Sequence, residues 1–435
     1  MRFRKLEIAD CKALADFFER NDDDSATRHF HPFPLNRLSA EALLKEKRRD
    51  SFFALWQEDR IIAFSMLRGF DEGYDIPSFG LLVDRHDRNK GLGRYLSDWT
   101  LLWADRSGIE AVRLNVYSDN PRAKALYESL GFSTIESTQL EGRSKSIMRR
   151  QRPEERIALY VSLLALKPAE SLVERIDQWH RYGLDFIEAT WYPNIEDAPP
   201  PLELMRDRTV IHNYFPPEPD DPFLNLASPN EANLRRSLEF YENRIDLSRQ
   251  LNAPWYSIHA GFIGDPIGRD SFGFLFQEPK QGEQIAALDR FANALPALEK
   301  QARDSSVSLL VENNVCSKSN RNKLLLVTPE EFQQFRDRYQ GEFFRILLDT
   351  GHMNVSAKTL EFEASAFLDL ASNIEGVHLH QNDGEADQHL PVFANDWPVD
   401  FALEVKPRYA SLEGRYSSLE ELQDAYIEIY RRLNG

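Results

Sequence analysis

The feature that most constrains the fold of this chain is a regular alternation of apolar and amphipathic segments that begins near residue 157. Eight short apolar runs follow one another there, mostly separated by polar-amphipathic segments of helix length. Strands that alternate with crossover helices form parallel sheets, and eight such units close a (β/α)8 barrel. The sequence therefore predicts a TIM barrel over residues 156–435, built on the runs IALYVSLLAL, DFIEATWY, TVIHNYF, WYSIHAGF, VSLLVENN, RILLDTGH, GVHLHQND and FALEVKPR.

A separate α+β domain is predicted for residues 1–150. The acidic pair Glu58-Asp59 lies between two apolar runs, which indicates a hairpin. A chain of 435 residues also exceeds the roughly 250–300 residues at which one core usually stops growing. We place the boundary at the basic segment around Arg152-Pro153 and expect the two parts to fold independently. The strands expected in the first part are residues 51–57, 60–70, 79–84, 111–117 and 145–150, the last of which should close the sheet.

The charge is distributed unevenly between the two parts. Residues 1–150 carry 25 Lys and Arg against 24 Asp and Glu, so the total of −17 leaves −18 for the rest of the chain. This excess of acid repels a phosphate backbone and argues against nucleic acid as a partner. The chain shows no run of about 18 apolar residues, and its two cysteines, Cys11 and Cys316, are far apart. We therefore expect no membrane span, no disulfide framework and a reduced, cytoplasmic setting, and we leave open whether the chain forms a homo-oligomer.

Two motifs in the first part carry chemistry. Arg88-Asn89-Lys90-Gly91-Leu92-Gly93 stands between a predicted strand and an amphipathic helix, where glycines and the N–H groups of the helix start can bind a pyrophosphate. The second motif runs from Asn120 to Phe132. Asn120 is a good helix cap, Pro121 suits the first helical position, and Gly131 suits the position after the last turn.

These two motifs, in this order, resemble the GNAT family of acetyl-CoA-dependent N-acetyltransferases. The resemblance implies that Tyr127 gives a proton to the departing CoA thiolate, which a phenol with a reference pKa of about 10 can do at neutral pH. The carboxylate base that many relatives have before Val83 is not evident, and Asp75 is the nearest candidate. The module could therefore be an active enzyme, or one that only binds CoA or mediates oligomerisation. The residues implied to bind acetyl-CoA are Val83, Arg88, Asn89, Lys90, Gly91, Leu92, Gly93 and Asn120.

Ligand-type side chains stand at the C-terminal ends of the predicted barrel strands. Catalytic groups of (β/α)8 barrels lie at this end, so these side chains can converge. A single histidine in such a place is usually structural, but nine residues of this kind predict a metal site. The nine are His212, His259, Glu312, Asp349, His352, His380, Asp387, His389 and Glu404.

From about Ile157 to Arg408 the pattern resembles the xylose-isomerase-like barrels, which include sugar isomerases and epimerases, 3-dehydroshikimate dehydratases and type IV AP endonucleases. The isomerase branch implies one divalent ion, of Mn, Mg, Fe, Co or Zn, because carboxylates and imidazoles suit all of these. In that branch the two glutamates of the ligand set move protons on opposite faces of a carbon next to a carbonyl, and His352 touches the substrate oxygens. The implied ligands are Glu312, Asp349, His380 and Glu404.

The endonuclease branch is the alternative, since all nine residues have counterparts there that bind three zinc ions. Three features argue against it: the charge of −18, the loop 390–397 without glycine, and the first strand, Ile157–Ser162, without histidine. We therefore interpret the chain as a bifunctional enzyme for small-molecule substrates. Its first part would acetylate an amine, and its barrel would isomerise, epimerise or dehydrate a polyhydroxylated carbonyl compound. The alternative is a zinc phosphodiesterase on damaged DNA with an accessory GNAT domain.

Overall fold

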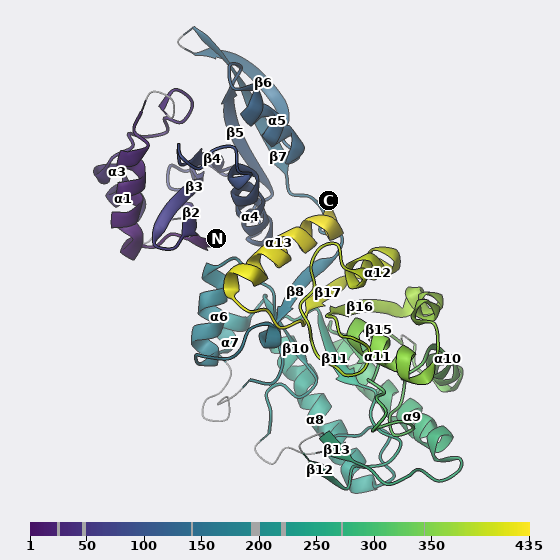
Figure 1. The fold of residues 1–435 in the computed structure, drawn as a ribbon. Helices are drawn as coiled ribbons and strands as arrows, with labels where there is room; N and C mark the ends of the chain where they lie inside the picture. The colour runs from purple at the N-terminus through teal and green to yellow at the C-terminus, as the bar shows by residue number, and fades with distance from the viewer. Residues whose placement is uncertain are drawn as a thin grey trace. The chain divides into compact units, whose positions relative to one another are not determined.

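The computed structural model describes residues 1–23, 27–45, 49–140, 142–192, 201–218, 223–270, 273–342 and 344–435. The chain divides into two compact units, whose ribbon is drawn in Figure 1. The first unit comprises Met1–Glu154 and Trp179–Gly183, and the second comprises Glu155–Gln178 and Leu184–Gly435. None of the described helices has the length and apolar content needed to span a membrane. Independent folding of the two parts stays a prediction.

The first unit is a seven-stranded sheet with helices packed on it. The strands lie in the order β1-β2-β3-β4-β5-β7-β6. They are β1 (Arg2–Lys5), β2 (Ser51–Gln57), β3 (Arg60–Arg68), β4 (Ser78–Val83), β5 (Ala111–Tyr117), β6 (Ser133–Leu140) and β7 (Arg143–Gln151). The helices are η1 (Ile8–Asp10), α1 (Cys11–Arg20), α3 (Arg37–Leu43), α4 (Leu92–Arg106) and α5 (Pro121–Ser129).

The alternation of side chains along β3 explains why helices cover both faces of this sheet. Phe64 packs in the apolar cluster that Phe17 and Phe18 of α1 help to form. The next residue, Ser65, points to the opposite face and hydrogen-bonds Thr100 of α4 at 2.6 Å between the two hydroxyl oxygens. Since helices bury both faces of the sheet at this strand, the sequence of β3 is almost continuously apolar.

Strands β4 and β5 are parallel but separate early. Their register contains a single pair, Ser78 with Arg113, and the backbone N–H of Arg113 also donates to the carbonyl oxygen of Pro77 at 3.0 Å. Beyond this point the two strands diverge, whereas β3 stays paired with β4 as far as Val83. The divergence leaves room between β4 and β5 for a ligand.

Most of the strands expected in the first part are confirmed. The hairpin around Glu58, whose φ is 53°, joins β2 to β3, and the strands expected at 79–84 and 111–117 are β4 and β5. The edge of the sheet was predicted wrongly. Strand β7 lies between β5 and β6, so the segment 145–150 does not close the sheet. The edge strand β6 was not predicted because its sequence, STIESTQL, is mostly polar.

The second unit is a closed barrel of eight parallel strands, which confirms the predicted barrel. The order around it is β10-β11-β14-β15-β16-β17-β8-β9. These strands are β8 (Ala158–Ser162), β9 (Ile187–Ala189), β10 (Thr209–His212), β11 (Trp255–His259), β14 (Ser308–Glu312), β15 (Ile346–Asp349), β16 (Ile374–Leu379) and β17 (Tyr409–Leu412). A two-stranded excursion, β12 (Gly268–Asp270) and β13 (Gly273–Leu275), follows β11.

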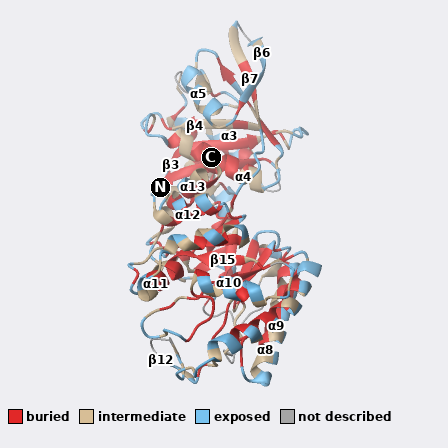
Figure 2. Cartoon of the chain, turned by 90° about the vertical axis from the view of Figure 1, so that its right-hand side faces the viewer, coloured by how far each residue is buried: buried red, intermediate tan, exposed pale blue. Residues whose placement is uncertain are grey.

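Helices follow the barrel strands, and Figure 2 shows that buried residues gather on the strands while exposed ones mark the outer helix faces. The barrel interior is packed with aromatic side chains, among them Tyr160, Trp255 and Tyr409, whose ring centroids lie 5.7–6.4 Å apart. The α-helices are α6 (Leu172–Arg181), α7 (Leu202–Met205), α8 (Glu231–Gln250), α9 (Glu283–Asp304), α10 (Pro329–Arg338), α11 (Thr350–Leu360), α12 (Trp397–Val405) and α13 (Leu419–Asn434). Two 3-10 helices, η2 (Leu163–Ala165) and η4 (Ala364–Asn373), complete the unit.

The last of the eight predicted strands is wrong. The run FALEV belongs to helix α12, which has a proline near its start, where the missing N–H costs nothing. A short apolar run fits a buried helix face as well as a strand, and here the helix forms. The eighth strand is β17, which pairs in parallel with both β16 and β8 and so closes the barrel. The buried residues of α12 are Pro398, Val399, Phe401, Ala402 and Val405.

The side chain of Asn434 joins the last helix to the chain entering the first barrel strand. Its Oδ1 accepts from the backbone N–H groups of Arg156 and Ile157 at 2.8 and 3.0 Å, and its Nδ2 donates to the carbonyl oxygen of Ile157 at 3.0 Å. We expect Asn434→Ala to lower the free energy of unfolding by about 1–3 kcal/mol, because these backbone groups lose their partner. Thermal unfolding should show the loss. Glu428→Ala, at an exposed site of the same helix, should change stability by less than about 0.5 kcal/mol, and equal effects of the two variants would contradict this role.

Candidate functional site

The turn between β4 and α4 forms one wall of a cavity in the first unit. Gly91 precedes the helix with φ +79°, a conformation that side-chain-bearing residues rarely adopt. The first N–H groups of α4 have no acceptor within the helix, so they are available to an anion. The cavity has a volume of about 440 Å³. Its lining includes all but one of the residues expected to bind acetyl-CoA, namely Val83, Arg88, Asn89, Gly91, Leu92, Gly93 and Asn120.

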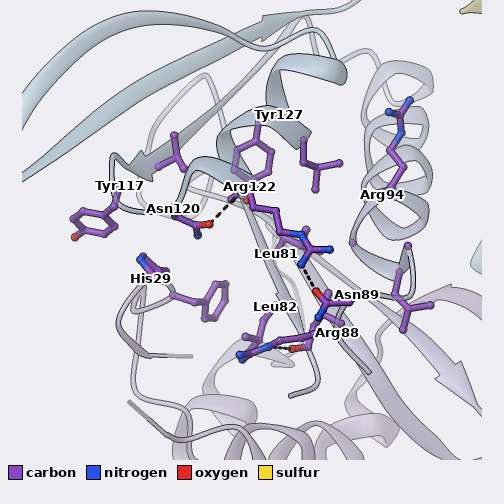
Figure 3. A pocket seen from close by; sticks show the side chains of 18 of the residues that line it. His29, Leu81, Leu82, Arg88, Asn89, Arg94, Tyr117, Asn120, Arg122 and Tyr127 are labelled. Carbon is purple, nitrogen blue, oxygen red and sulfur yellow. Dashed lines mark hydrogen bonds between the residues drawn. The ribbon is translucent and has the colours of Figure 1, made fainter. Parts of the chain in front are cut away.

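Lys90 is the exception, since it does not line this cavity. Its Nζ lies 2.7 Å from a carboxylate oxygen of Asp87, so the lysine is already paired. A second cation that the sequence reading missed takes part instead. Arg122, near the start of α5, lines the cavity and donates to Asn89 Oδ1, and Figure 3 shows it beside Arg88 and Asn89. Its signal in the sequence was a basic residue in the first turn of the predicted helix.

Helix α5 positions Tyr127 as the sequence predicted. Asn120 Oδ1 accepts from the N–H of Ala123 at 3.2 Å, Pro121 is the first helical residue, and Gly131 has φ +86° after the last turn. Tyr127 lines the cavity, and burial raises the pKa of its phenol to about 12. The phenol is therefore neutral at physiological pH and has a proton to give. Asp75 is exposed and does not line the cavity, so the structure offers it no part in catalysis there.

Arg88 is expected to bind the cofactor by charge as well as by its place in the turn. Its Nε donates to the carbonyl oxygen of Val83 at 3.4 Å, which holds it over the cavity. We expect Arg88→Ala to weaken acetyl-CoA binding on the order of 5- to 150-fold, the equivalent of one charge-assisted hydrogen bond, with the metal content of the barrel unchanged. Calorimetry measures the affinity for acetyl-CoA of the variant and of the unchanged protein. Arg37→Ala, in an exposed pair with Glu41, is the control, and equal affinities of the two variants would refute the assignment.

The second candidate site lies at the C-terminal end of the barrel strands. Ten His, Asp and Glu side chains there form five overlapping groups, in each of which one ligand atom per residue lies within 4.8 Å of the others. Asp387 joins them, because its carboxylate lies 3.4 Å from His352 Nε2 and 3.1 Å from His389 Nε2. The members are Glu188, His212, His259, Glu312, Asp349, His352, His378, His380, Asp387, His389 and Glu413, and we call them the barrel cluster.

His378 lies at the centre of the barrel cluster and is fully buried. Its Nε2 lies 2.9 Å from Glu188 Oε1, which fixes the ring. Its Nδ1 faces three carboxylates, those of Glu413 at 2.9 Å and of Glu312 and Asp349 at 3.5 Å each. Burial lowers the pKa of His378, but the charges of Glu188 and Glu413 outweigh this effect and raise the pKa well above its usual value. Glu188 thus orients the imidazole, as carboxylates do for metal-binding histidines.

One side of the barrel cluster is formed by His212, His259 and Glu312, at the ends of β10, β11 and β14. Glu312 Oε2 lies 3.4 Å from His212 Nε2 and 3.5 Å from His259 Nδ1. Burial lowers the pKa of His259 to about 4, so this ring is neutral and able to bind a metal. Burial alone would raise the pKa of Glu312, but the surrounding imidazoles lower it, so the glutamate is ionised.

The other side is organised by Asp349 and the start of α11. Asp349 Oδ1 caps this helix by accepting from the N–H of His352 at 2.6 Å, and its carboxylate also lies 2.9 Å from His380 Nε2. A β-carbon at Gly351 would lie 1.9 Å from His380 Cε1, so the sequence Asp-Thr-Gly-His permits the close approach of this ring. His352 donates Nδ1–H to the carbonyl oxygen of Asn313 at 2.9 Å. Its other ring nitrogen, Nε2, points towards the carboxylate of Asp387.

The barrel cluster fits metal ions on two observations. Within the described residues, seven of its buried ligand atoms have no hydrogen-bond partner in suitable geometry, although His378 Nδ1 lies 2.9 Å from Glu413. The seven are Glu188 Oε2, His259 Nδ1, Glu312 Oε2, His378 Nδ1, His380 Nδ1, Asp387 Oδ1 and His389 Nδ1. Such atoms are costly to bury unless an ion or water binds them. Five carboxylates also share this small region, and bound cations can neutralise them without protonating the histidines. Mixed imidazole and carboxylate donors suit Zn, Mn, Fe or Co.

Most of the predicted metal ligands are in the barrel cluster, but Glu404 is not. The structure places Glu404 on the exposed face of α12, so it cannot bind the same ion as Glu312. Its expected place is taken by Glu413, the residue directly after β17. His380, directly after β16, belongs to the cluster, although His378 within that strand holds the central position. The sequence reading missed Glu188, His378 and Glu413, and for Glu413 the signal was its place after the short run YASL.

Glu413 and Glu404 form a matched pair for a test of the metal site. We expect Glu413→Ala to weaken metal binding by more than about 100-fold, beyond the 10- to 100-fold typical of an outer partner, since a direct ligand is lost. Glu404→Ala should leave the affinity unchanged. Elemental analysis after dialysis against metal at graded concentrations measures both, with circular dichroism to verify folding. Loss of metal in the Glu404 variant alone would overturn the assignment.

A barrel with a cluster of side chains that could hold metal ions, carried on one chain with a cavity beside a glycine turn and a helix start, defines a protein of two modules. The model of the family described as xylose isomerase-like TIM barrel matches residues 176–406, more than half of the chain, and that of the acetyltransferase (GNAT) family matches residues 14–132. The chain therefore belongs to the xylose isomerase-like TIM barrel family and carries a GNAT domain before the barrel. Both predicted resemblances are confirmed.

Solved structures are similar to each module. A D-tagatose 3-epimerase-like protein is 21% identical with a TM-score of 0.46, covering 63% of this chain and 98% of its own. The ribosomal-protein-S18-alanine N-acetyltransferase from Escherichia coli is 25% identical with a TM-score of 0.28, covering 34% and 92%. A GNAT-family acetyltransferase from Streptococcus pneumoniae is 19% identical with a TM-score of 0.30, covering 35% and 98%. None of the curated proteins matches this chain.

Proposed function

We propose that the chain is a bifunctional enzyme for small-molecule substrates: an acetyl-CoA-dependent N-acetyltransferase joined to a divalent-metal-dependent isomerase, epimerase or dehydratase. The observation that carries the barrel assignment is that Glu312 and Glu413 flank the same buried imidazole, His378, at the end of the barrel where catalytic groups lie. Two carboxylates beside one metal position suit the removal and return of a proton at a carbon next to a carbonyl.

In the first module, the start of α4 and Arg88 would bind the pyrophosphate of CoA. Tyr127 would give its proton to the sulfur that leaves when the acetyl group is transferred. Its raised pKa supports this role, because the phenol stays protonated across the range in which amines are acetylated. Arg122 supplies further positive charge to the same cavity.

In the barrel, the residues of the cluster divide into ligands and groups that act on the substrate. The ligands of a single ion would be Glu312, Asp349, His378 and Glu413, and such an ion stabilises negative charge on a substrate oxygen. Glu312 and Glu413 would take and return the proton of the substrate carbon. Glu413 thus replaces Glu404 in the pair of glutamates that the sequence predicted. His352, whose Nε2 lies 3.4 Å from Asp387, would contact the substrate oxygens.

A zinc phosphodiesterase is the second candidate, and the size of the barrel cluster favours it. One divalent ion neutralises two of the five carboxylates, so the remaining charge must be met by protonated histidines or by further ions. Burial lowers the pKa of His389, but the contact with Asp387 outweighs this effect and raises the pKa to about 9. This histidine therefore takes up a proton when no ion is bound. Three ions would neutralise the cluster without protonating any histidine.

The number of metal ions separates the two candidates. On the proposed function we expect about one divalent ion per chain by elemental analysis, and little change of metal content or activity in His389→Ala. Substrates to test are keto sugars and dehydroshikimate, with abasic-site DNA as the comparison. Three zinc ions per chain, together with the loss of both metal and activity in the His389 variant, would reject the isomerase assignment in favour of the phosphodiesterase.

A further inference from the structure

A second cavity adjoins the first in the N-terminal unit, and the proposed function does not account for its chemistry. It has a volume of about 600 Å³ and lies where β4 and β5 separate after the Ser78–Arg113 pair. Leu81, Tyr117 and Tyr127 line both cavities. A molecule in the second cavity therefore lies next to the phenol proposed to protonate the CoA sulfur.

The charged side chains of the second cavity are mainly cationic. Its lining contains Arg68, Arg113 and Lys145, and Glu72 is the one acidic residue among the lining residues that the structure describes. Glu72 already forms an ion pair within the cavity, because Arg68 Nε donates to its Oε1 at 2.9 Å. This pair cancels, so the unbalanced charge of the cavity lies on Arg113 and Lys145.

Arg113 is held in place by contacts that leave its charge uncompensated. Its Nε donates to Ser78 Oγ at 3.2 Å, and its guanidinium lies 4.7 Å from the centroid of the Tyr74 ring. Neither partner is an acid, and in the described part of the chain no carboxylate lies within 4.0 Å of the guanidinium nitrogens. The terminal nitrogens form a fork of donors that matches an acid group.

Lys145 provides the second charge from a neighbouring strand. It pairs with Tyr117 in the antiparallel register of β5 and β7, and residues 113, 115 and 117 of β5 lie on one face of the sheet because side chains alternate. Lys145 and Arg113 thus face the same cavity from two strands. Among the residues that the structure describes, Lys145 too has no carboxylate partner.

We propose that the second cavity binds the acceptor of acetyl transfer, and that this acceptor is an amine carrying an acid group, a carboxylate or a phosphate, held by Arg113 and Lys145. The proposal rests on the proposed acetyltransferase function and names its class of substrate. The same charges exclude polyamines, because a second ammonium group would be repelled by the two cations.

The cationic cavity also bears on how the amine becomes reactive. A bound carboxylate neutralises only one of the two positive charges of Arg113 and Lys145, and the remaining charge disfavours an ammonium ion and lowers the pKa of the bound amine, so the neutral nucleophile forms more readily. In the reaction the amine nitrogen bonds to the acetyl carbonyl carbon and loses one proton to water, while the C–S bond breaks. The sulfur leaves with the bonding electrons and takes one proton from Tyr127, which is later reprotonated from water. The products are the N-acetyl compound and free CoA.

Matched acceptors test the proposal on the full-length protein with acetyl-CoA. Phenylalanine is compared with phenylalaninamide, and O-phosphoethanolamine with ethanolamine, so that each pair differs in one acid group; spermidine is the polycation. We expect kcat/KM to be at least about tenfold higher for the acid of at least one pair, and the pair that shows it identifies carboxylate or phosphate. Arg113→Ala should lower this preference about 10- to 100-fold, Arg113→Lys should lower it less, and Arg37→Ala should keep it.

Lys145→Ala repeats the test from another strand if Arg113→Ala does not fold. Equal rates for acids and their neutral partners, or a preference for spermidine, would overturn the proposal and leave the acetyltransferase function standing. If acetyl-CoA binds but no amine is acetylated, calorimetric binding of the same acids and amides in the presence of CoA decides the question. Absence of any acetyl-CoA binding would instead reject the proposed function itself.

Discussion

The placement of five carboxylates, four of them buried, beside six imidazoles is the constraint on which the architecture of the barrel's C-terminal end depends. A buried carboxylate is stable only if opposite charge or several donors face it, and each acid here lies against at least one histidine ring. His378 illustrates this, since it is in contact with carboxylates from β9, β14 and β15 and with the one that follows β17. Because the ligand atoms come from separate strands, the cluster exists only when the whole barrel is closed.

The fold could be predicted largely from alternation, and the site less completely, for reasons that differ among residues. Strand-end histidines and acids such as His212 and Glu312 were found because parallel strands end at one edge, so their last residues converge. Glu188 was overlooked because it lies within a short apolar run and pairs with His378, 190 positions away. Glu413 was missed because the strand before it has only four residues, whereas the neighbouring run FALEV is longer and more apolar. His378 lies in β16 and His380, two positions later, directly follows its last residue, so an alternating pattern places both on the same side and could not decide between them.

The N-terminal unit shows the complementary case, in which a local motif predicts one cavity and says nothing of the next. The turn before α4 binds through backbone groups, and those depend on glycines and on the helix start, which are visible in a short stretch of sequence. The two unbalanced cations of the second cavity, Arg113 and Lys145, come from single positions on β5 and β7, and no local motif marks either of them in the sequence. Only the divergence of β4 from β5 turns Arg113 from an ordinary surface arginine into one that faces a cavity. The absence of an evident carboxylate base in the sequence is consistent with this arrangement, since a cationic cavity itself favours the neutral amine.

Charge also limits what the barrel can bind once ions are present. The part of the chain after residue 150 has a formal charge of −18, the remainder when the +1 of the first 150 residues is taken from the total of −17. Three divalent ions would contribute six positive charges and reduce −18 to −12, so metal binding at the site does not make this part cationic. Duplex DNA is bound by exchanging condensed counterions for protein cations, and a surface that remains this acidic provides few of them. A small substrate needs no such surface, because the ions and the histidines of the cluster lie within its reach. The surplus of acid outside the cluster therefore weighs against a DNA substrate, and the metal count together with the His389 variant decides between the two candidates.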